Sequence, residues 1–142
     1  MKTLTILGAL PEKEEDYKKY ETIIEVWKKF FYNIHSPIDT KKFNWTYFER
    51  FKRAISVVKK SDLIIWELSQ ASTGQWIEIW IAYNLETPIV IIAKTNSKIS
   101  GLIKWNPFVK EIIFYESIDE IKKGKFEWNG ISNTLREYLW CK

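Results

Sequence analysis

One stretch decides the fold: residues 62–68 read Asp-Leu-Ile-Ile-Trp-Glu-Leu. Apart from Glu67 the run after Asp62 is continuously apolar, as is typical of a strand in a parallel sheet that is buried on both faces. Working outward from this strand, we expect four more strands, at 3–7, 32–35, 88–93 and 111–115.

The segments between these strands have helical patterns. Helices are expected at 11–30, 43–60, 74–85 and 131–140, with a short helix or turn at 100–105. Because strands and helices alternate along the chain, the sequence predicts an α/β fold with a parallel sheet and helices on both faces. Ligands bind such sheets beyond the carboxyl ends of the strands, where the strand order reverses.

The composition limits the domain number, the kind of ligand and the compartment to be expected. A chain of 142 residues without an internal repeat or a linker is expected to form one domain, 1–142. Its net charge of +4 fits an anionic small ligand. The single cysteine, Cys141, excludes an intrachain disulfide and fits a reducing compartment. With no secretory pattern and no apolar run of about 20 residues, we expect a cytoplasmic protein.

Glu78 is the only charged residue between Gly74 and Leu85. Its neighbours in the sequence are tryptophan and isoleucine, and a carboxylate in apolar surroundings is costly unless it is paired, neutral or facing a cavity. A carboxylate on the second turn of a helix can act as a nucleophile toward a sugar carbon that is positively charged in the transition state. The alternative is a half-exposed glutamate on the outer side of the helix.

The segment before Glu78 has the pattern of a helix start. Ser72 and Gln75 have the spacing of a capping box, so they could be a helix cap and nothing more. The free amides of a helix start, with the Ser72 hydroxyl, can also bind phosphate, and Gly74 would let a ligand approach the backbone closely.

Other motifs are weaker. The turn Gly8-Ala9-Leu10 after the first strand is as compatible with a tight turn as with a ligand contact, and it lacks the dinucleotide-binding pattern. The single histidine, His35, is interpreted as structural. No cluster of His and Cys suggests a metal site, and no cofactor is expected.

The segment from Lys41 to Lys60 interleaves basic and aromatic residues. A single-stranded nucleic acid could bind such a surface. We interpret it instead as a solvated helix with an apolar inner face, so nucleic acid is not the expected partner.

The block from Ser61 to Ala82 resembles the signature of the nucleoside 2-deoxyribosyltransferase family: a strand with an acid, a turn with Ser and Gly, and a helix with Glu then Ala four residues on. Residues 6–10, 34–37 and 87–90 resemble the first strand and glycine turn, the second strand with its Ser-Pro turn, and the following strand. The resemblance implies a flavodoxin-like five-stranded sheet and a homodimer. It also implies cleavage of the bond between base and sugar.

The resemblance places Glu78 at the position of the family's catalytic nucleophile. Ser72 is similar to the branch that hydrolyses 2′-deoxynucleoside 5′-monophosphates, because a hydroxyl attracts a phosphate where an acid would repel it. Residues 100–104 resemble a segment of that branch in which a serine reaches the phosphate in the neighbouring subunit. The resemblance therefore implies phosphate binding by Ser72, Gly74 and Ser100, with Gly8 and Ala9 at the sugar or base end.

Three positions depart from the pattern. Ala54, eight residues before Asp62, stands where the family has an Asp that orients the nucleophile or protonates the leaving base. Thr5 stands in place of a Tyr, and Ala71 stands where Pro is common. Glu49, Asp39 and Glu67 are candidate substitutes for the missing acid. We therefore expect an enzyme, an N-glycosidase on nucleoside 5′-monophosphates with Glu78 as the nucleophile. The alternatives are deoxyribosyl transfer between free nucleosides and an inactive nucleotide-binding module.

Overall fold

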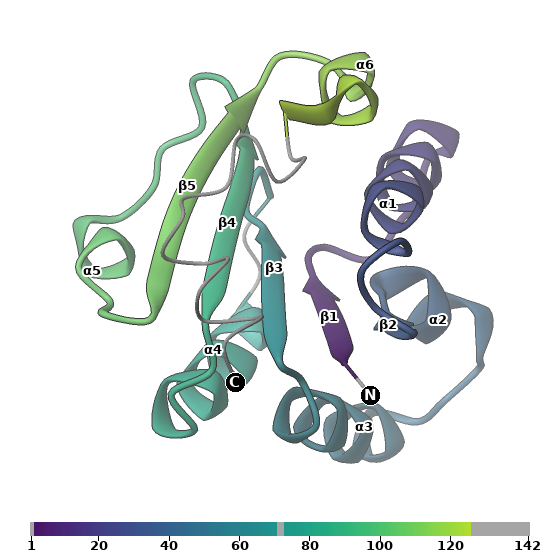
Figure 1. Ribbon diagram of the computed structural model, residues 1–142. Coiled ribbons are helices and arrows are strands. Elements are labelled where there is room, and N and C mark those ends of the chain that lie inside the picture. Colours follow the sequence, from purple (N-terminus) through teal and green to yellow (C-terminus); the bar gives the residue numbers. More distant parts are fainter. Residues whose placement is uncertain (1, 71–72, 126–142) are drawn as a thin grey trace.

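We describe a computed structural model of the chain, in which residues 2–70 and 73–125 are placed (Figure 1). Five strands form one parallel sheet in the order β2-β1-β3-β4-β5. The strands are β1 (Thr3–Leu7), β2 (Asn33–His35), β3 (Leu63–Glu67), β4 (Ile89–Lys94) and β5 (Val109–Tyr115). This is the flavodoxin-like architecture that the sequence predicts, and the strand order reverses between β1 and β3.

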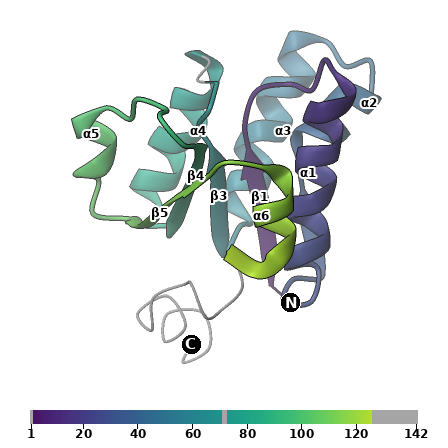
Figure 2. The same cartoon turned by 90° about the horizontal axis from the view of Figure 1, so that it is seen from above.

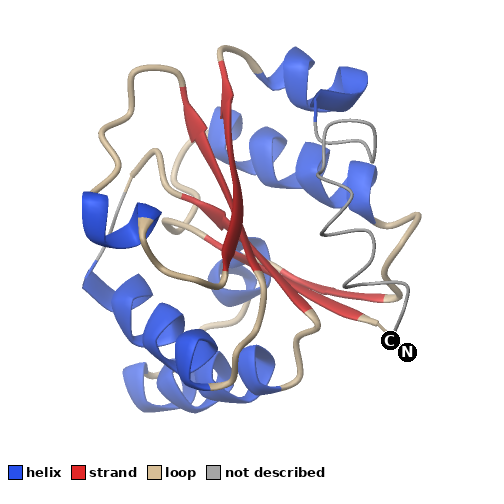
Figure 3. Cartoon of the chain, turned by 60° about the vertical axis from the view of Figure 1, so that its left-hand side comes forward, coloured by secondary structure: helices blue, strands red, loops and turns tan. Residues whose placement is uncertain are grey.

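Helices cover both faces of the sheet (Figures 2 and 3). On one face lie α1 (Glu14–Trp27), α6 (Ile118–Glu120) and a π-helical turn (Ile121–Lys125), and on the other lie α3 (Tyr47–Lys59), α4 (Thr73–Asn84) and α5 (Gly101–Lys104). A short helix, α2 (Pro37–Lys42), connects β2 to α3. None of the helices in the described ranges is long and apolar enough to cross a membrane.

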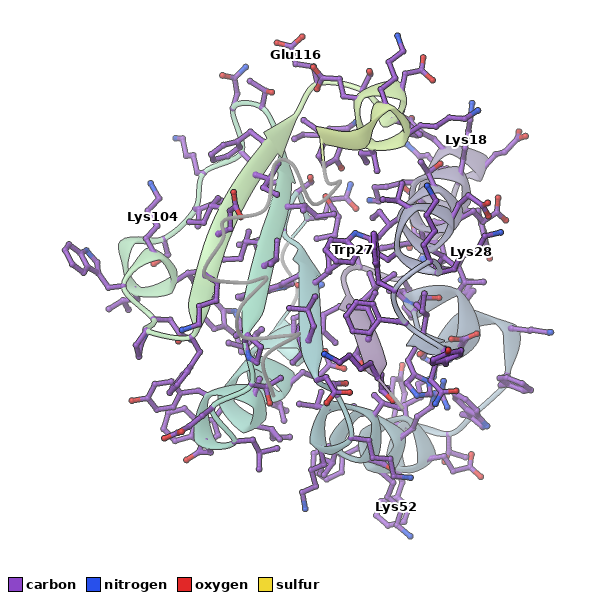
Figure 4. All side chains as sticks on the ribbon, in the orientation of Figure 1. Lys18, Trp27, Lys28, Lys52, Lys104 and Glu116 are labelled. Carbon is purple, nitrogen blue, oxygen red and sulfur yellow. The ribbon has the colours of Figure 1, made fainter. Side chains whose placement is uncertain are left out.

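Each face has its own apolar core. In the α1 core, Trp27 packs edge-on against Phe30. Lys18 of α1 and Lys28, the residue that follows the helix, point away from the sheet (Figure 4). In the α3–α4 core, Ile64 and Trp66 of β3 pack with Val58, Ile79 and Ala82. All five residues of β3 are buried, which confirms the prediction from its uninterrupted apolar sequence.

The helix boundaries differ from expectation in three places. The predicted helix 11–30 is shorter in the structure, Glu14–Trp27. The predicted helix 43–60 begins only at Tyr47, because Thr46 caps it: the Thr46 hydroxyl accepts from the Glu49 amide and Glu49 accepts from the Thr46 amide. The Ser-Pro turn begins helix α2, with Ser36 as the cap and Pro37 in its first turn. The predicted helix 131–140 lies outside the described residues.

Asp62 joins the beginnings of two neighbouring strands. Its carboxylate accepts from the Thr3 amide at 2.7 Å, and its own amide donates to the Thr3 carbonyl at 2.8 Å. These two bonds join the beginning of β1 to the beginning of β3. They fix the register of β3 against β1, the strand whose end lines the cavity described below.

Candidate active site

A cavity of about 400 Å³ opens beside β1 and β2 on the α3–α4 face of the sheet. Its walls come from the end of β1, the β2–α2 junction, α3 and the first two turns of α4. It therefore lies at the point of strand reversal, where parallel α/β sheets bind ligands. The sequence-predicted residues Glu78, Gly74 and Gly8 all line it.

Glu78 projects from the second turn of α4 into this cavity. It is half-buried, and within the described residues it has no hydrogen-bond or ion-pair partner. Burial alone raises its pKa to about 7. Near neutral pH a substantial fraction is therefore an unpaired, poorly solvated carboxylate, which is the state a nucleophile needs.

The start of α4 lies beside Glu78. Gly74 lines the cavity, and a side chain at this position would meet nothing within 4 Å. Ser72 lies outside the described residues, so its place stays a prediction. The oxygen of Gln75, expected in a capping box, instead accepts a hydrogen bond of 2.8 Å from the Trp66 indole nitrogen.

The residues of the turn after β1 line two different cavities. Gly8 lines the Glu78 cavity, whereas Ala9 lines a second cavity of about 650 Å³ on the α1 side, and Leu10 borders both. A Cβ at Gly8 would overlap the hydroxyl of Tyr20, which donates to the Ala9 carbonyl at 2.6 Å. Glycine is therefore required at position 8 for packing against Tyr20, independently of any ligand.

The second cavity contains a buried ion pair. Glu67, at the end of β3 and fully buried, accepts from Lys19 Nζ at 3.1 Å, from the Tyr115 hydroxyl at 2.9 Å and from the Ser69 hydroxyl. These contacts satisfy the carboxylate, and they hold the end of β3 against α1 and β5. We interpret this network as structural because every partner belongs to the fold itself. It lies on the opposite face of the sheet from Glu78.

None of the candidate substitutes for the missing acid reaches the Glu78 cavity. Ala54 and Thr5 line it as the resemblance implies, but Glu49 caps α3, Asp39 caps α2 and Glu67 belongs to the Lys19 network. Among the described residues, Glu78 is the single carboxylate in the cavity wall.

Arginines occupy the cavity instead. Arg50 and Arg53, on the same side of α3 as Ala54, both line it together with His35. Arg53 lies 3.7 Å from the Asp39 carboxylate and 3.4 Å from His35 Nδ1. Burial and the neighbouring Arg53 lower the pKa of His35, so it is neutral at pH 7.

The sequence interpretation of this helix as a solvated one missed the arginines. The signal was present in their spacing: Arg50 and Arg53 are three residues apart, and Ala54 and Val57 continue the same side. The five other basic residues of the segment 41–60, all of them exposed, obscured this signal.

Ser100 does not line the Glu78 cavity. It is exposed and caps α5, where its hydroxyl accepts from the Leu102 amide at 3.3 Å. Figure 1 shows α5 beside the edge strand β5, away from β1 and β2. Its predicted role in a neighbouring subunit's site stays a prediction.

Solved structures share this architecture. The chain aligns with the CMP N-glycosidase BcmB of Clostridium botulinum at a TM-score of 0.62 and 18% identity, over 86% of this chain and 96% of that one. It aligns with a 2-deoxyribosyltransferase of Bacillus psychrosaccharolyticus at a TM-score of 0.63 and 14% identity, over 91% and 95%. The chain has the fold of these two proteins. No protein-family model and no curated protein matches the sequence.

Proposed function

We propose that the protein is an N-glycosidase that hydrolyses the bond between base and sugar in nucleoside 5′-monophosphates, with Glu78 as the nucleophile. The observation that carries this proposal is the unpaired, desolvated Glu78 carboxylate in the wall of a cavity at the strand reversal. The shared fold with a CMP N-glycosidase and a 2-deoxyribosyltransferase supports it.

In the proposed reaction a Glu78 oxygen attacks the anomeric carbon of the sugar. The carbon–nitrogen bond breaks, its electron pair leaves with the base, and the base takes a proton from water. The sugar is then held as an ester of Glu78. Attack by water on the anomeric carbon frees the carboxylate and releases the sugar 5-phosphate and a proton.

The start of α4 is the proposed phosphate site. The first amides of an α-helix have no partner within the helix and can donate to an anion. Gly74, which lines the cavity with open space around its Cβ position, would leave the approach open. The predicted Ser72 hydroxyl would add a donor. Gly8 would contact the sugar or base end from the β1 side, whereas Ala9 faces the other cavity and would contribute through its backbone alone.

Base release from deoxynucleoside and ribonucleoside monophosphates, followed by chromatography, tests the proposal. We expect release by the wild type and a loss of at least about 1,000-fold for Glu78→Gln, which keeps the shape but removes the nucleophile. Mass spectrometry of quenched turnover should find a sugar phosphate on the peptide that contains Glu78. A variant that releases base as fast as the wild type would contradict the assignment.

Two alternatives share this site. Deoxyribosyl transfer uses the same first step, and a second base replaces water in the second; adding a free base to the assay distinguishes it by the appearance of a new nucleoside. Among residues 2–70 and 73–125 no second carboxylate lines the cavity beside Glu78, which favours an inactive nucleotide-binding module. Such a module would bind nucleotide and release no base.

A homodimer is part of the proposal. Along α4, Trp76, Ile77, Trp80 and Tyr83 are 41–65% exposed, so the helix that carries Glu78 is apolar on its outer side as well. A contiguous apolar surface of this kind indicates a protein interface. A second copy packed on α4 would cover it, and the role proposed for Ser100 requires that this residue of the second copy reach the cavity.

A further inference from the structure

The outer side of α3 carries exposed aromatic rings. Tyr47 is 88% exposed, Phe48 65% and Phe51 47%. These three residues share one side of the helix, because positions three or four apart are neighbours on a helix surface. The expected apolar inner face of this segment therefore does not include them, and Val58 is the one fully buried residue of Tyr47–Lys59. Rings exposed together in this way indicate a surface that contacts another molecule.

The same segment holds the positive charge of the chain. Residues 41–60 contain seven basic side chains and one acidic side chain, a net charge of +6 in a chain whose total is +4. The rest of the chain is therefore slightly acidic, with a net charge of −2. The five lysines of the segment are exposed, and Figure 4 shows Lys52 extending from α3 into solvent. This surface attracts an anionic partner.

Rings and cations lie side by side on this surface. Lys52 Nζ is 4.8 Å from the centre of the Phe48 ring. Ahead of the helix, Phe43 stacks on Trp45 with ring centres 4.7 Å apart, and the Arg53 guanidinium lies 4.8 Å from the centre of the Trp45 ring. A single strand of nucleic acid has the matching pattern, because each base offers a flat face for stacking and each phosphate offers a negative charge.

We propose that α3 and the segment before it bind single-stranded nucleic acid, with bases stacked on the exposed rings of Tyr47, Phe48 and Phe51 and with phosphates beside the exposed lysines. The exposure of the rings favours this partner over the solvated helix that the sequence predicts. Tyr47 and Phe51 also line the Glu78 cavity, so a strand bound here would lie beside the candidate active site. A duplex fits the surface poorly, because its bases are stacked on one another.

Two other partners fit this surface less well. On a helix that lies in a membrane interface, the charged side chains are on the opposite side from the apolar ones that enter the lipid. Here Lys52 lies over the Phe48 ring, so burying the ring in lipid would also desolvate the charge. A second copy packed on the same surface would place two segments of net charge +6 against each other.

Binding of a labelled oligonucleotide tests the inference. Fluorescence anisotropy with the Glu78→Gln protein compares a mixed-sequence single strand of about 12 nucleotides with its duplex. We expect tighter binding of the single strand, and weaker binding as the salt concentration rises from about 50 to 200 mM. Phe48→Ala should weaken binding of the strand about 5- to 100-fold. Lys52→Gln should make the slope of log K against log salt shallower by about 0.7.

Matched controls come from α5, where Lys104 precedes Trp105 and both are exposed. Trp105→Ala and Lys104→Gln change the same kinds of side chain away from α3 and should leave strand binding unchanged. Thermal unfolding establishes that each variant is folded. Because Phe48 and Lys52 are exposed, neither substitution removes a core contact.

No binding of the single strand at about 50 mM salt would overturn the inference, as would equal binding of the duplex. If Phe48→Ala weakens binding no more than Trp105→Ala does, the strand does not lie on α3 and the inference is wrong. Flotation with vesicles that contain phosphatidylserine tests the membrane: binding to vesicles without binding to the oligonucleotide would also overturn it. None of these measurements depends on base release, so this inference and the proposed function can fail separately.

Discussion

At the scale of single residues, Glu78 shows what an apolar helix does to a carboxylate. Partial burial without a partner raises its pKa to about 7. Since the nucleophile is the ionised form, base release should increase with pH and reach half its maximum near pH 7. The pH dependence of kcat at saturating nucleotide measures this, and a profile flat from pH 5 to 8 would contradict it.

The raised pKa of Glu78 also predicts how the stability of the protein depends on pH. The folded protein binds the Glu78 proton more tightly than the unfolded chain does, so its contribution to stability is present below about pH 4.5 and is lost as the pH rises to about 7. Glu78→Gln should therefore be more stable than the wild type at pH 8, by up to about 3 kcal/mol. Urea unfolding at pH 8 and at pH 4.5 should show a difference that vanishes at the lower pH.

Gly8 is a second residue whose environment predicts a measurable effect. In Gly8→Ala the added methyl group would overlap the Tyr20 hydroxyl and displace it from the Ala9 carbonyl. We expect a loss of about 1–3 kcal/mol in the free energy of unfolding. The matched control is the same substitution in a Tyr20→Phe background, where the hydroxyl is absent and the cost should be smaller; an equal cost would contradict the packing argument.

At the scale of elements, the Lys19–Glu67 pair joins α1 to β3. Both side chains are buried, so Lys19→Met leaves the Glu67 charge with hydroxyl partners alone. We expect a loss of about 3–5 kcal/mol. The double variant Lys19→Met/Glu67→Gln removes the unpaired charge and should recover much of that loss in denaturant unfolding. A single variant as stable as the wild type would show that the pair is dispensable.

The elements also show how far sequence reasoning reaches. The five strands and the parallel order follow from apolar runs such as 62–68 alternating with helical patterns, because burial on both faces leaves a strong signal. Helix α2 was missed because Pro37 reads as a turn signal, although proline is equally suited to the first turn of a helix.

The residues of the candidate site that could be predicted are those whose polarity differs from that of their neighbours in the sequence. Glu78 stands out as one charge in an apolar helix, and the structure places it in the cavity with Gly74 and Gly8. Arg50 does not stand out among seven basic residues in the segment 41–60. Gln75 depends on Trp66, nine residues away, and that contact exists only once α4 packs on β3.

At the scale of the whole molecule, the apolar outer side of α4 predicts self-association. Trp80 is 65% exposed, so Trp80→Lys should convert the proposed dimer to a monomer with little effect on folding. Sedimentation equilibrium at micromolar concentration measures the mass of the particle in solution and so distinguishes dimer from monomer. Tyr32→Lys, at an 83% exposed aromatic residue before β2, is the control and should leave the dimer intact; a monomeric wild type would contradict the proposal.

The all-parallel strand order also decides how the chain reaches its folded state. No two neighbouring strands are joined by a hairpin, and the bond that begins the β1–β3 pairing, from Thr3 to Asp62, spans 59 residues. The central strand therefore cannot be paired on both sides until the chain beyond β3 has been synthesised and has closed a long loop. Folding should be slow for a chain of this length, in the range of milliseconds to seconds that is typical of non-local topologies.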